Sequence, residues 1–224
     1  MALAAAGLLA VAPAVADAPP AGVLKCAFVC VNGVFNSELI GPYDVLEHSR
    51  YRDKANYIET FIVSPEGEPF VTAEGITIQA HYGFENAPGA DILVIPSTET
   101  SMSDDLKNEA YKGYVKRAVE AATWVITVCD GAFALAATGA LDGRSATTFP
   151  SDREALAKMF PQIDVRTDAR IVVDGKYITS VGGGMSYEPA FWLVEHLYGV
   201  EHAKRSAQGL VWPWDATSVP TLVK

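Results

Sequence analysis

The chain has 224 residues, half of them hydrophobic, and its 17 basic and 27 acidic residues give a net charge of −10. This length and apolar content fit one compact domain. The acidic balance and the lack of a basic run argue against nucleic acid or an anionic membrane surface as a partner.

The first 22 residues differ in composition from the rest. Residues 2–16 are apolar and alanine-rich and end in Ala14-Val15-Ala16, which is typical of a secretory signal with a small-residue cleavage site. The stretch is too short to span a bilayer. No Lys or Arg precedes it, so a disordered Ala/Pro tail is the alternative. We expect residues 1–22 to be a signal peptide or a disordered tail with a linker. The protein would then be periplasmic or secreted, with a cytoplasmic location as the alternative.

Strand-like and helix-like segments alternate through residues 23–215, which we take as one domain, with 216–224 as a C-terminal tail. Apolar runs predict strands at residues 24–31, 57–63, 91–95, 123–128 and 145–148 and hairpins at 68–82 and 170–180. Helical spacing predicts helices at residues 37–49, 106–122, 152–160 and 187–197, with Ser151 capping the third. Such alternation predicts an α/β domain with a mostly parallel sheet covered on both faces.

Cys129 is the residue with the clearest chemical signal. A β-rich run reaches this cysteine and then turns at once into a small-residue helical run. The pattern predicts a nucleophile elbow, where the helix N-terminus and exposed N–H groups favour a thiolate. The alternative is a buried structural cysteine. Cys26 and Cys30 lie four apart on a predicted strand, where packing is the expected role, and neither a disulfide framework nor zinc spacing is present.

Loops at the carboxyl ends of parallel strands commonly form the site in such sheets. Glu38 opens the first helix after the first strand, where it either complements the helix dipole or faces Cys129 as an acidic partner. Backbone N–H groups of the loop that begins at Ser97 and Thr98 could form an oxyanion pocket with that of Asp130, within the turn from Cys129 to Gly131. The four histidines follow none of these strands, so we expect surface or capping roles for them and no Cys–His pair.

Three segments together resemble the ThiJ/PfpI superfamily, relatives of class I glutamine amidotransferase domains. They are Glu38-Leu39-Ile40-Gly41-Pro42-Tyr43-Asp44, Val128-Cys129-Asp130-Gly131-Ala132 running on to Thr147-Thr148, and Thr179-Ser180-Val181-Gly182-Gly183 leading into Glu188. The resemblance implies a flavodoxin-like three-layer sandwich, a homodimer, a small-molecule substrate, and neither a metal nor an organic cofactor. It also implies Cys129 as the nucleophile and Glu38 as its acidic partner.

Within the superfamily the chain looks most similar to the isocyanide hydratase branch and to sensor-like domains fused to some transcription regulators. Three positions depart from the patterns of relatives. Phe149 stands where many carry a histidine, and Asp130 stands where hydratases have a small hydroxyl residue. Ser97-Thr98 replaces the paired glycines of the oxyanion loop.

The sequence therefore predicts a cysteine-dependent hydratase or lyase that converts an isonitrile and water into an N-substituted formamide. Cys129, Glu38 and Asp130 would carry the chemistry, and Ser97, Thr98 and Gly131 would bind the oxyanion or substrate. Two alternatives use the same thiol. One is a glyoxalase-like or deglycase-like activity on α-oxoaldehydes, and the other is a non-enzymatic redox-sensing or ligand-binding domain.

Overall fold

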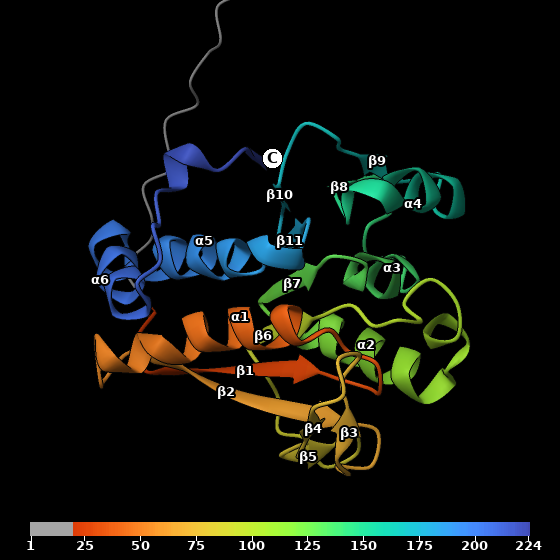
Figure 1. Cartoon of the computed structure of the whole chain (residues 1–224), viewed down its shortest axis with the longest axis horizontal. Helices are drawn as coiled ribbons and strands as arrows, with labels where there is room; N and C mark the ends of the chain where they lie inside the picture. Colours follow the sequence, from red (N-terminus) through yellow and green to blue (C-terminus); the bar gives the residue numbers. More distant parts are fainter. Residues whose placement is uncertain (1–19) are drawn as a thin grey trace, which may run out of the picture.

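The computed structural model describes residues 20–224, so most of the predicted signal segment lies outside the described residues. An eight-stranded sheet in the order β12-β10-β11-β7-β6-β1-β2-β5 forms the centre of the molecule (Figure 1). Its strands are β1 (Val23–Val29), β2 (Tyr57–Ser64), β5 (Tyr82–Gly83), β6 (Ile92–Ile95), β7 (Trp124–Val128), β10 (Ile171–Asp174), β11 (Tyr177–Ser180) and β12 (Thr221–Val223). Every neighbouring pair is parallel except β10 and β11, which form the predicted hairpin.

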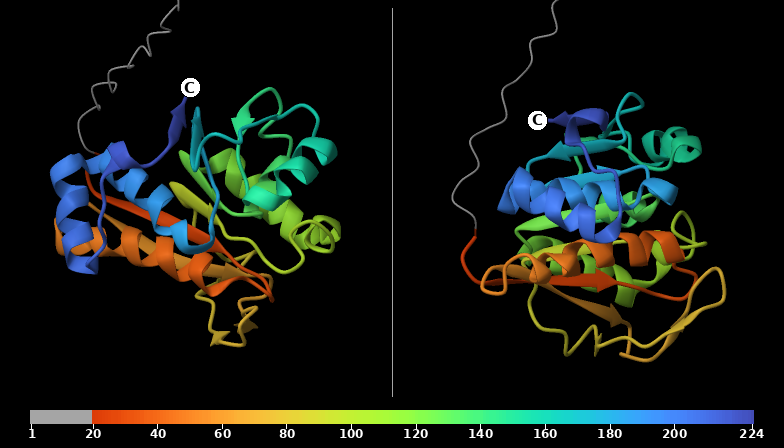
Figure 2. Two further views of the ribbon diagram at one scale, coloured as in Figure 1. Left: turned by 45° about the horizontal axis from the view of Figure 1, so that its top comes forward. Right: turned by 60° about the vertical axis from the view of Figure 1, so that its left-hand side comes forward.

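Helices cover both faces of this sheet, which confirms the flavodoxin-like three-layer sandwich. They are α1 (Asn36–His48), α2 (Glu109–Ala121), α3 (Gly131–Ala136), α4 (Arg153–Met159), α5 (Tyr187–Tyr198) and α6 (Val200–Leu210). The helices α1, α5 and α6 cover one face of the sheet, and α2, α3 and α4 cover the other (Figure 2). Their apolar side chains belong to two separate cores, one on each face. Among the described residues, no helix is long and apolar enough to cross a membrane.

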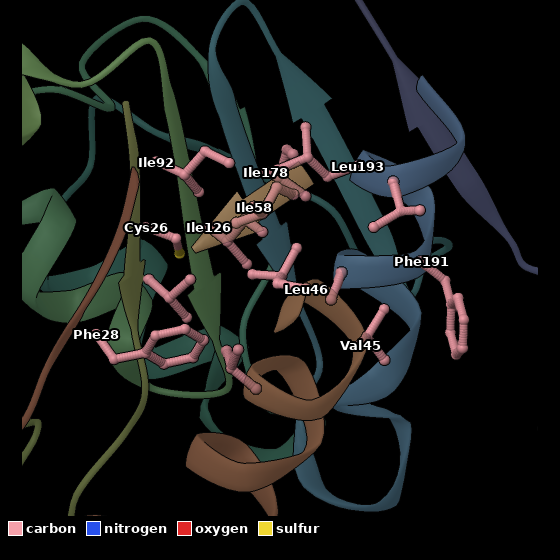
Figure 3. Close-up of a cluster of buried hydrophobic side chains, with 14 of the residues drawn as sticks. Cys26, Phe28, Val45, Leu46, Ile58, Ile92, Ile126, Ile178, Phe191 and Leu193 are labelled. Carbon is pink, nitrogen blue, oxygen red and sulfur yellow. The ribbon is translucent and has the colours of Figure 1, made fainter. Parts of the chain in front are cut away.

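The side chains of β1 alternate between the two faces of the sheet, which shows why helices must cover both faces. Cys26 and Phe28 point into the core beneath α1 and α5, where Leu46 and Phe191 also lie (Figure 3). Ala27 and Val29 point into the opposite core. Successive strand residues face opposite sides, so a continuous apolar run is stable only when both sides are covered. Cys26 and Cys30 are free, buried thiols in agreement with a packing role.

Three secondary-structure elements differ from the sequence prediction. The helix α6 was not predicted at all. The segment 216–224, taken as a tail, contains β12, which pairs with β10 at the edge of the sheet. The strand predicted at 145–148 is only β8 (Ser145–Ala146), and it pairs with β9 (Asp164–Val165) in a separate small sheet.

Short strands and 3₁₀ turns connect the main elements. The predicted hairpin after β2 exists as β3 (Phe70–Val71) paired with β4 (Thr77–Ile78). The Ser151 cap is wrong, because the 3₁₀ turn η3 (Pro150–Asp152) precedes α4 and places Asp152 at the N-cap position. Proline fixes the backbone of that turn and so delays the start of the helix. The remaining 3₁₀ turns are η1 (Ser49–Tyr51), η2 (Asp105–Lys107), η4 (Gly183–Met185) and η5 (Ala216–Ser218).

His202 was expected at the surface, but it is buried on α6 and stacks on Tyr198. Burial is the main cause that lowers its pKa, and the nearby Arg205 acts in the same direction. The unfolded chain would therefore bind a proton on this residue at a higher pH than the folded chain does. By linkage, this group destabilises the fold as the pH falls below about 6.5.

We expect His202→Gln to reduce the loss of stability between pH 7 and pH 5. Urea unfolding of wild type and variant at both pH values measures this difference. Other groups titrate in the same range, so only the change caused by the substitution is informative. An identical loss of stability in both proteins would contradict the prediction.

Candidate active site

Four neighbouring strands end at one edge of the sheet and bring the site together. Glu38 follows β1, Ser97 follows β6, Cys129 follows β7, and the segment Gly182–Gly183 follows β11. In the sheet these strands lie side by side in the order β11-β7-β6-β1. The carboxyl ends of parallel strands therefore collect residues that are up to 145 positions apart in the chain.

Cys129 forms a tight turn between β7 and α3. Its φ of 54° lies in the left-handed region, which is uncommon for a residue with a side chain. The N–H of Cys129 donates to the carbonyl oxygen of Ser180 at 3.0 Å, which ties the turn to β11. A strained conformation of this kind persists only where its surroundings hold it, and it occurs most often at functional sites. The geometry matches the predicted nucleophile elbow.

Two glycines make room for this turn. A Cβ on Gly131 would lie far inside van der Waals distance of the Ile95 carbonyl oxygen, and 2.9 Å from the carbon of that carbonyl. A Cβ on Gly182 would lie 2.8 Å from the nitrogen of Cys129, and Gly182 has a φ of +71°. The elbow is therefore enclosed by backbone from β6 on one side and from the β11 loop on the other.

The Glu38 carboxyl is buried at the first turn of α1 and faces the elbow. Its Oε2 accepts from the N–H of Ser97 at 3.1 Å and lies 2.5 Å from the Ser97 Oγ, while Oε1 accepts from the N–H of Gly183 at 3.4 Å. Its side chain also forms a hydrogen bond with Cys129. Burial raises the pKa of Glu38, which favours its protonated form. The acid is therefore able to hold a proton beside the sulfur.

The thiol of Cys129 is only 6% exposed, and this burial is the main reason why its pKa is raised. The negative charges of Glu38 and Asp130 raise the pKa further, whereas a hydrogen bond from Ser97 lowers it. Ionised neighbouring acids therefore disfavour the thiolate in addition to burial. The helix that follows, α3, has six residues, and its N-terminus does not offset these effects.

We expect Glu38→Gln to lower the pKa of Cys129, because the substitution removes a negative charge next to the sulfur. The measurement is the ultraviolet absorbance of the thiolate against pH, with Cys129→Ala as the blank. Glu99→Gln is the matched control, since Glu99 is an exposed carboxylate in the loop that contains Ser97. A pKa that rises in Glu38→Gln would show instead that the neutral acid stabilises the thiolate by donating a hydrogen bond.

The three residues predicted to bind an oxyanion or substrate have different surroundings. Ser97 contacts both Glu38 and Cys129, so its hydroxyl bridges the two. The Thr98 hydroxyl is 2.5 Å from an oxygen of Asp105, and the Thr98 N–H donates to Ser101 Oγ at 2.8 Å. Both polar groups of Thr98 are thus committed within its own loop. Gly131 contributes space for the turn.

The backbone N–H of Asp130 is the first N–H group after Cys129 in the turn. Within residues 20–224 it donates no hydrogen bond, whereas the N–H groups of Ser97 and Thr98 are both occupied. It directly follows Cys129, as the oxyanion donor follows the nucleophile in nucleophile elbows of other enzymes. Among the described residues this N–H is therefore available to the oxyanion pocket that was predicted from the 97–98 loop.

A pocket of about 440 Å³ opens beside the elbow. It is lined by Phe149, Pro150, Arg153, Thr167, Asp168, Ala169, Arg170, Val181, Gly182, Gly183, Gly184, Met185 and Pro220. Phe149 and Met185 are both 39% exposed, which gives the entrance an apolar character. Gly182 packs against Cys129 and so connects this pocket with the elbow, but Cys129, Glu38 and Ser97 are not among its lining residues.

No histidine takes part in this site. His81 accepts from the N–H of Ile62, and His196 stacks on Trp192. His48 lies at the end of α1 and His202 on α6. In the part of the chain that is described, no group of three or more His, Cys, Asp or Glu residues could hold a metal ion.

Three residues of the site were not predicted from the sequence. Gly183 donates to Glu38, although no role in the site was predicted for it; its place after a core strand was a usable signal. The Thr148 hydroxyl lies 2.9 Å from the Cys129 carbonyl oxygen and 2.8 Å from Asp130 Oδ1. Asp152 reaches Asp130 from η3, and nothing in the sequence indicated that contact.

A family model described as the DJ-1/PfpI family matches residues 24–196. The chain belongs to this family. It is 26% identical over 181 residues to the isonitrile hydratase of Pseudomonas putida, a match that covers 81% of the chain and 75% of that protein. A deglycase of Pyrococcus horikoshii is 25% identical over 159 residues, or 70% of the chain and 89% of that protein.

Solved structures agree on the fold of this DJ-1/PfpI member. The crystal structure of a ThiJ/PfpI family protein from Pseudomonas syringae superposes with a TM-score of 0.77 and 23% identity, over 87% of the chain and 77% of that protein. The resemblance drawn from the three sequence segments is confirmed.

Proposed function

We propose that this protein is a cysteine-dependent hydratase that converts an isonitrile into an N-substituted formamide. The observation that carries the proposal is the contact of Cys129 with a buried acid, Glu38, and the Ser97 hydroxyl, with no histidine beside them. This arrangement offers a nucleophile and a proton but no neutral base of the Cys–His type. The 26% identity to an isonitrile hydratase, over most of both chains, supports the same reaction.

The reaction uses one proton, which is transferred to the substrate carbon in the first step and released again in the last. The Cys129 thiolate attacks the terminal isonitrile carbon, and as the C–S bond forms, that carbon takes up a proton to give a thioimidate. Water then adds to the C=N bond, its oxygen on carbon and one of its protons on nitrogen. Loss of the hydroxyl proton and cleavage of the C–S bond release the formamide and restore the thiolate. Glu38, whose side chain forms a hydrogen bond with that of Cys129, is the acid placed to supply this proton.

A ligand-binding role without turnover is the second candidate. The raised pKa of Cys129 favours it, because a protonated thiol is a weak nucleophile. The same property weakens a redox-sensing role, which needs thiolate character and exposure. A deglycase-like activity on α-oxoaldehydes is supported by the Pyrococcus horikoshii relative.

We also propose a homodimer, which size-exclusion chromatography with light scattering would test.

Incubation of the purified protein with tert-butyl isocyanide tests the proposal. We expect N-tert-butylformamide in the product mixture, detected by proton NMR, and none with Cys129→Ser. A parallel incubation with methylglyoxal, followed by assay for lactate, tests the deglycase-like alternative. Turnover of neither compound by folded wild type would leave ligand binding as the leading function.

A further inference from the structure

The pocket of about 440 Å³ beside the elbow carries positive charge in a chain whose net charge is −10. Two arginines, Arg153 and Arg170, are among its lining residues. The lining includes a single acid, Asp168, whose two carboxylate oxygens accept from Arg166 at 3.1 Å and 2.8 Å. Because Asp168 already has a partner, it does not neutralise the arginines of the pocket.

Arg153 is held in place by neutral acceptors. Its Nε donates to Thr147 Oγ1 at 3.1 Å, and Nη1 and Nη2 donate to the carbonyl oxygens of Thr167 at 3.1 Å and Ala169 at 3.0 Å. A guanidinium has five N–H donors, so these three bonds leave one unused donor on each Nη atom. Within residues 20–224 Arg153 forms no ion pair. Since Thr167 and Ala169 also line the pocket, Arg153 brings an unneutralised charge to its wall.

Arg170 adds a second guanidinium on the side of the pocket where Met185 lies. Its Nη2 is 2.9 Å from Glu188 Oε1, so the charge of Arg170 is balanced by that of Glu188. Its Nη1 contacts only the sulfur of Met185, at 3.9 Å. A thioether sulfur is a weak acceptor, so a carboxylate oxygen would be a better partner for this nitrogen.

Apolar side chains and the elbow support form the rest of the pocket. Phe149 and Met185 line it and are both partly exposed. Gly182 and Gly183 line it too, and they are the residues that pack against Cys129 and donate to Glu38. An apolar surface with a few well-placed polar groups is typical of small-molecule sites, and about 440 Å³ lies within their usual range of roughly 300–1,000 Å³.

We propose that this pocket binds a small organic monocarboxylate, with its carboxylate on Arg153 and its apolar body against Phe149 and Met185. The single unneutralised guanidinium matches one negative charge, whereas a phosphate group carries more than one at neutral pH. The planar fork of a guanidinium also suits a planar carboxylate. This binding does not depend on the hydratase function, because it requires no turnover at Cys129.

Phenylacetate is the probe for this site, and 2-phenylethanol is its neutral counterpart with the same phenyl body. Titration of the nitrogen-15-labelled full chain, followed by two-dimensional NMR, gives both the affinity and the location. We expect saturable shifts at the amide signals of residues 182–184. We also expect phenylacetate to bind at least about tenfold more tightly than 2-phenylethanol, because a hydrogen bond to a charged group is stronger than a neutral one.

Arg153→Gln is expected to remove the preference for phenylacetate over 2-phenylethanol. Because Arg153 also supports the backbone at Thr167 and Ala169, Thr167→Glu is the second variant. Thr167 is exposed, and a carboxylate placed there would compete with the ligand for the guanidinium. Arg117→Gln is the matched control, since Arg117 is an exposed arginine on α2 that does not line the pocket.

Equal affinity for phenylacetate and 2-phenylethanol, or shifts that leave residues 182–184 unaffected, would overturn the proposal. Unchanged binding of phenylacetate in both folded Arg153→Gln and Thr167→Glu would overturn it as well. Tighter binding of inorganic phosphate than of phenylacetate would overturn the assignment to a monocarboxylate. Equal weakening in Arg117→Gln would assign the effect to net charge and overturn the role of Arg153. The titration contains no isonitrile, so failure of the hydratase assay leaves its outcome unaffected.

Discussion

Gly131→Ala is expected to destabilise the protein by about 3 kcal/mol or more and to remove the reactivity of Cys129. The added methyl group would overlap the carbonyl of Ile95, with its carbon 2.9 Å from the new Cβ. Backbone atoms of a core strand cannot move aside as a flexible side chain can, so α3 or β6 must shift. Either shift changes the left-handed turn at Cys129 and its contacts with Glu38 and Ser97.

Urea unfolding and the rate of iodoacetamide labelling at Cys129 measure the two effects of Gly131→Ala. Gly89→Ala is the control, because Gly89 is exposed and a Cβ added there would meet no atom within 4 Å. We expect the control to match wild type in labelling and to change stability by less than about 1 kcal/mol. Wild-type stability in Gly131→Ala would show that the close packing of the elbow on β6 is not needed.

Cys129→Ser is expected to reduce isonitrile hydration by about 10⁴-fold or more while leaving the fold intact. Serine is nearly the same size as cysteine, but its hydroxyl needs a general base to become a nucleophile. The site offers Glu38 and Asp130, both with raised pKa values, and no histidine. The serine hydroxyl therefore lacks the histidine base that activates the serine nucleophile of Ser–His–Asp hydrolases.

Initial rates of formamide production measure the effect of Cys129→Ser. Cys26→Ala is the matched control, since it removes another buried thiol on a strand that also leads to the site. We expect this control to turn over the isonitrile at a rate close to wild type. If Cys129→Ser keeps more than a tenth of the wild-type rate, covalent catalysis by Cys129 is wrong.

Sequence patterns were sufficient to predict the layers of the fold and the edge of the sheet that carries the site. The strand that ends at Val128 and the helix that begins at Asn36 are local features with clear periodicity, and the rule that parallel strands align their ends brings Glu38 and Cys129 to one edge. The helix α6 was missed because it contains Ser206 and Gly209, which disfavour helices in isolation. Its packing on α1 and α5 compensates for these residues.

The finer features of the site depend on contacts that no local pattern encodes. The side chain of Thr98 turns toward Asp105 because a buried carboxylate needs donors, and this was not visible from the loop sequence alone. Asp152 meets Asp130 only because β8 and η3 return the chain to the elbow after α3. The raised pKa of Cys129 could not be predicted from the local sequence either, because it depends on how deeply the complete core buries the thiol.

The packing of Gly182 against Cys129 has a consequence for the order in which the site can assemble during folding. The backbone of the elbow is held from behind by the loop after β11, and β11 is made of residues near the end of the domain. A chain that has emerged only as far as α4 already contains Glu38, Ser97 and Cys129, but it lacks the wall that holds the sulfur in place. The environment of the thiol is thus completed by a late long-range contact, so the accessibility of Cys129 to a labelling reagent reports on whether the whole sheet has formed.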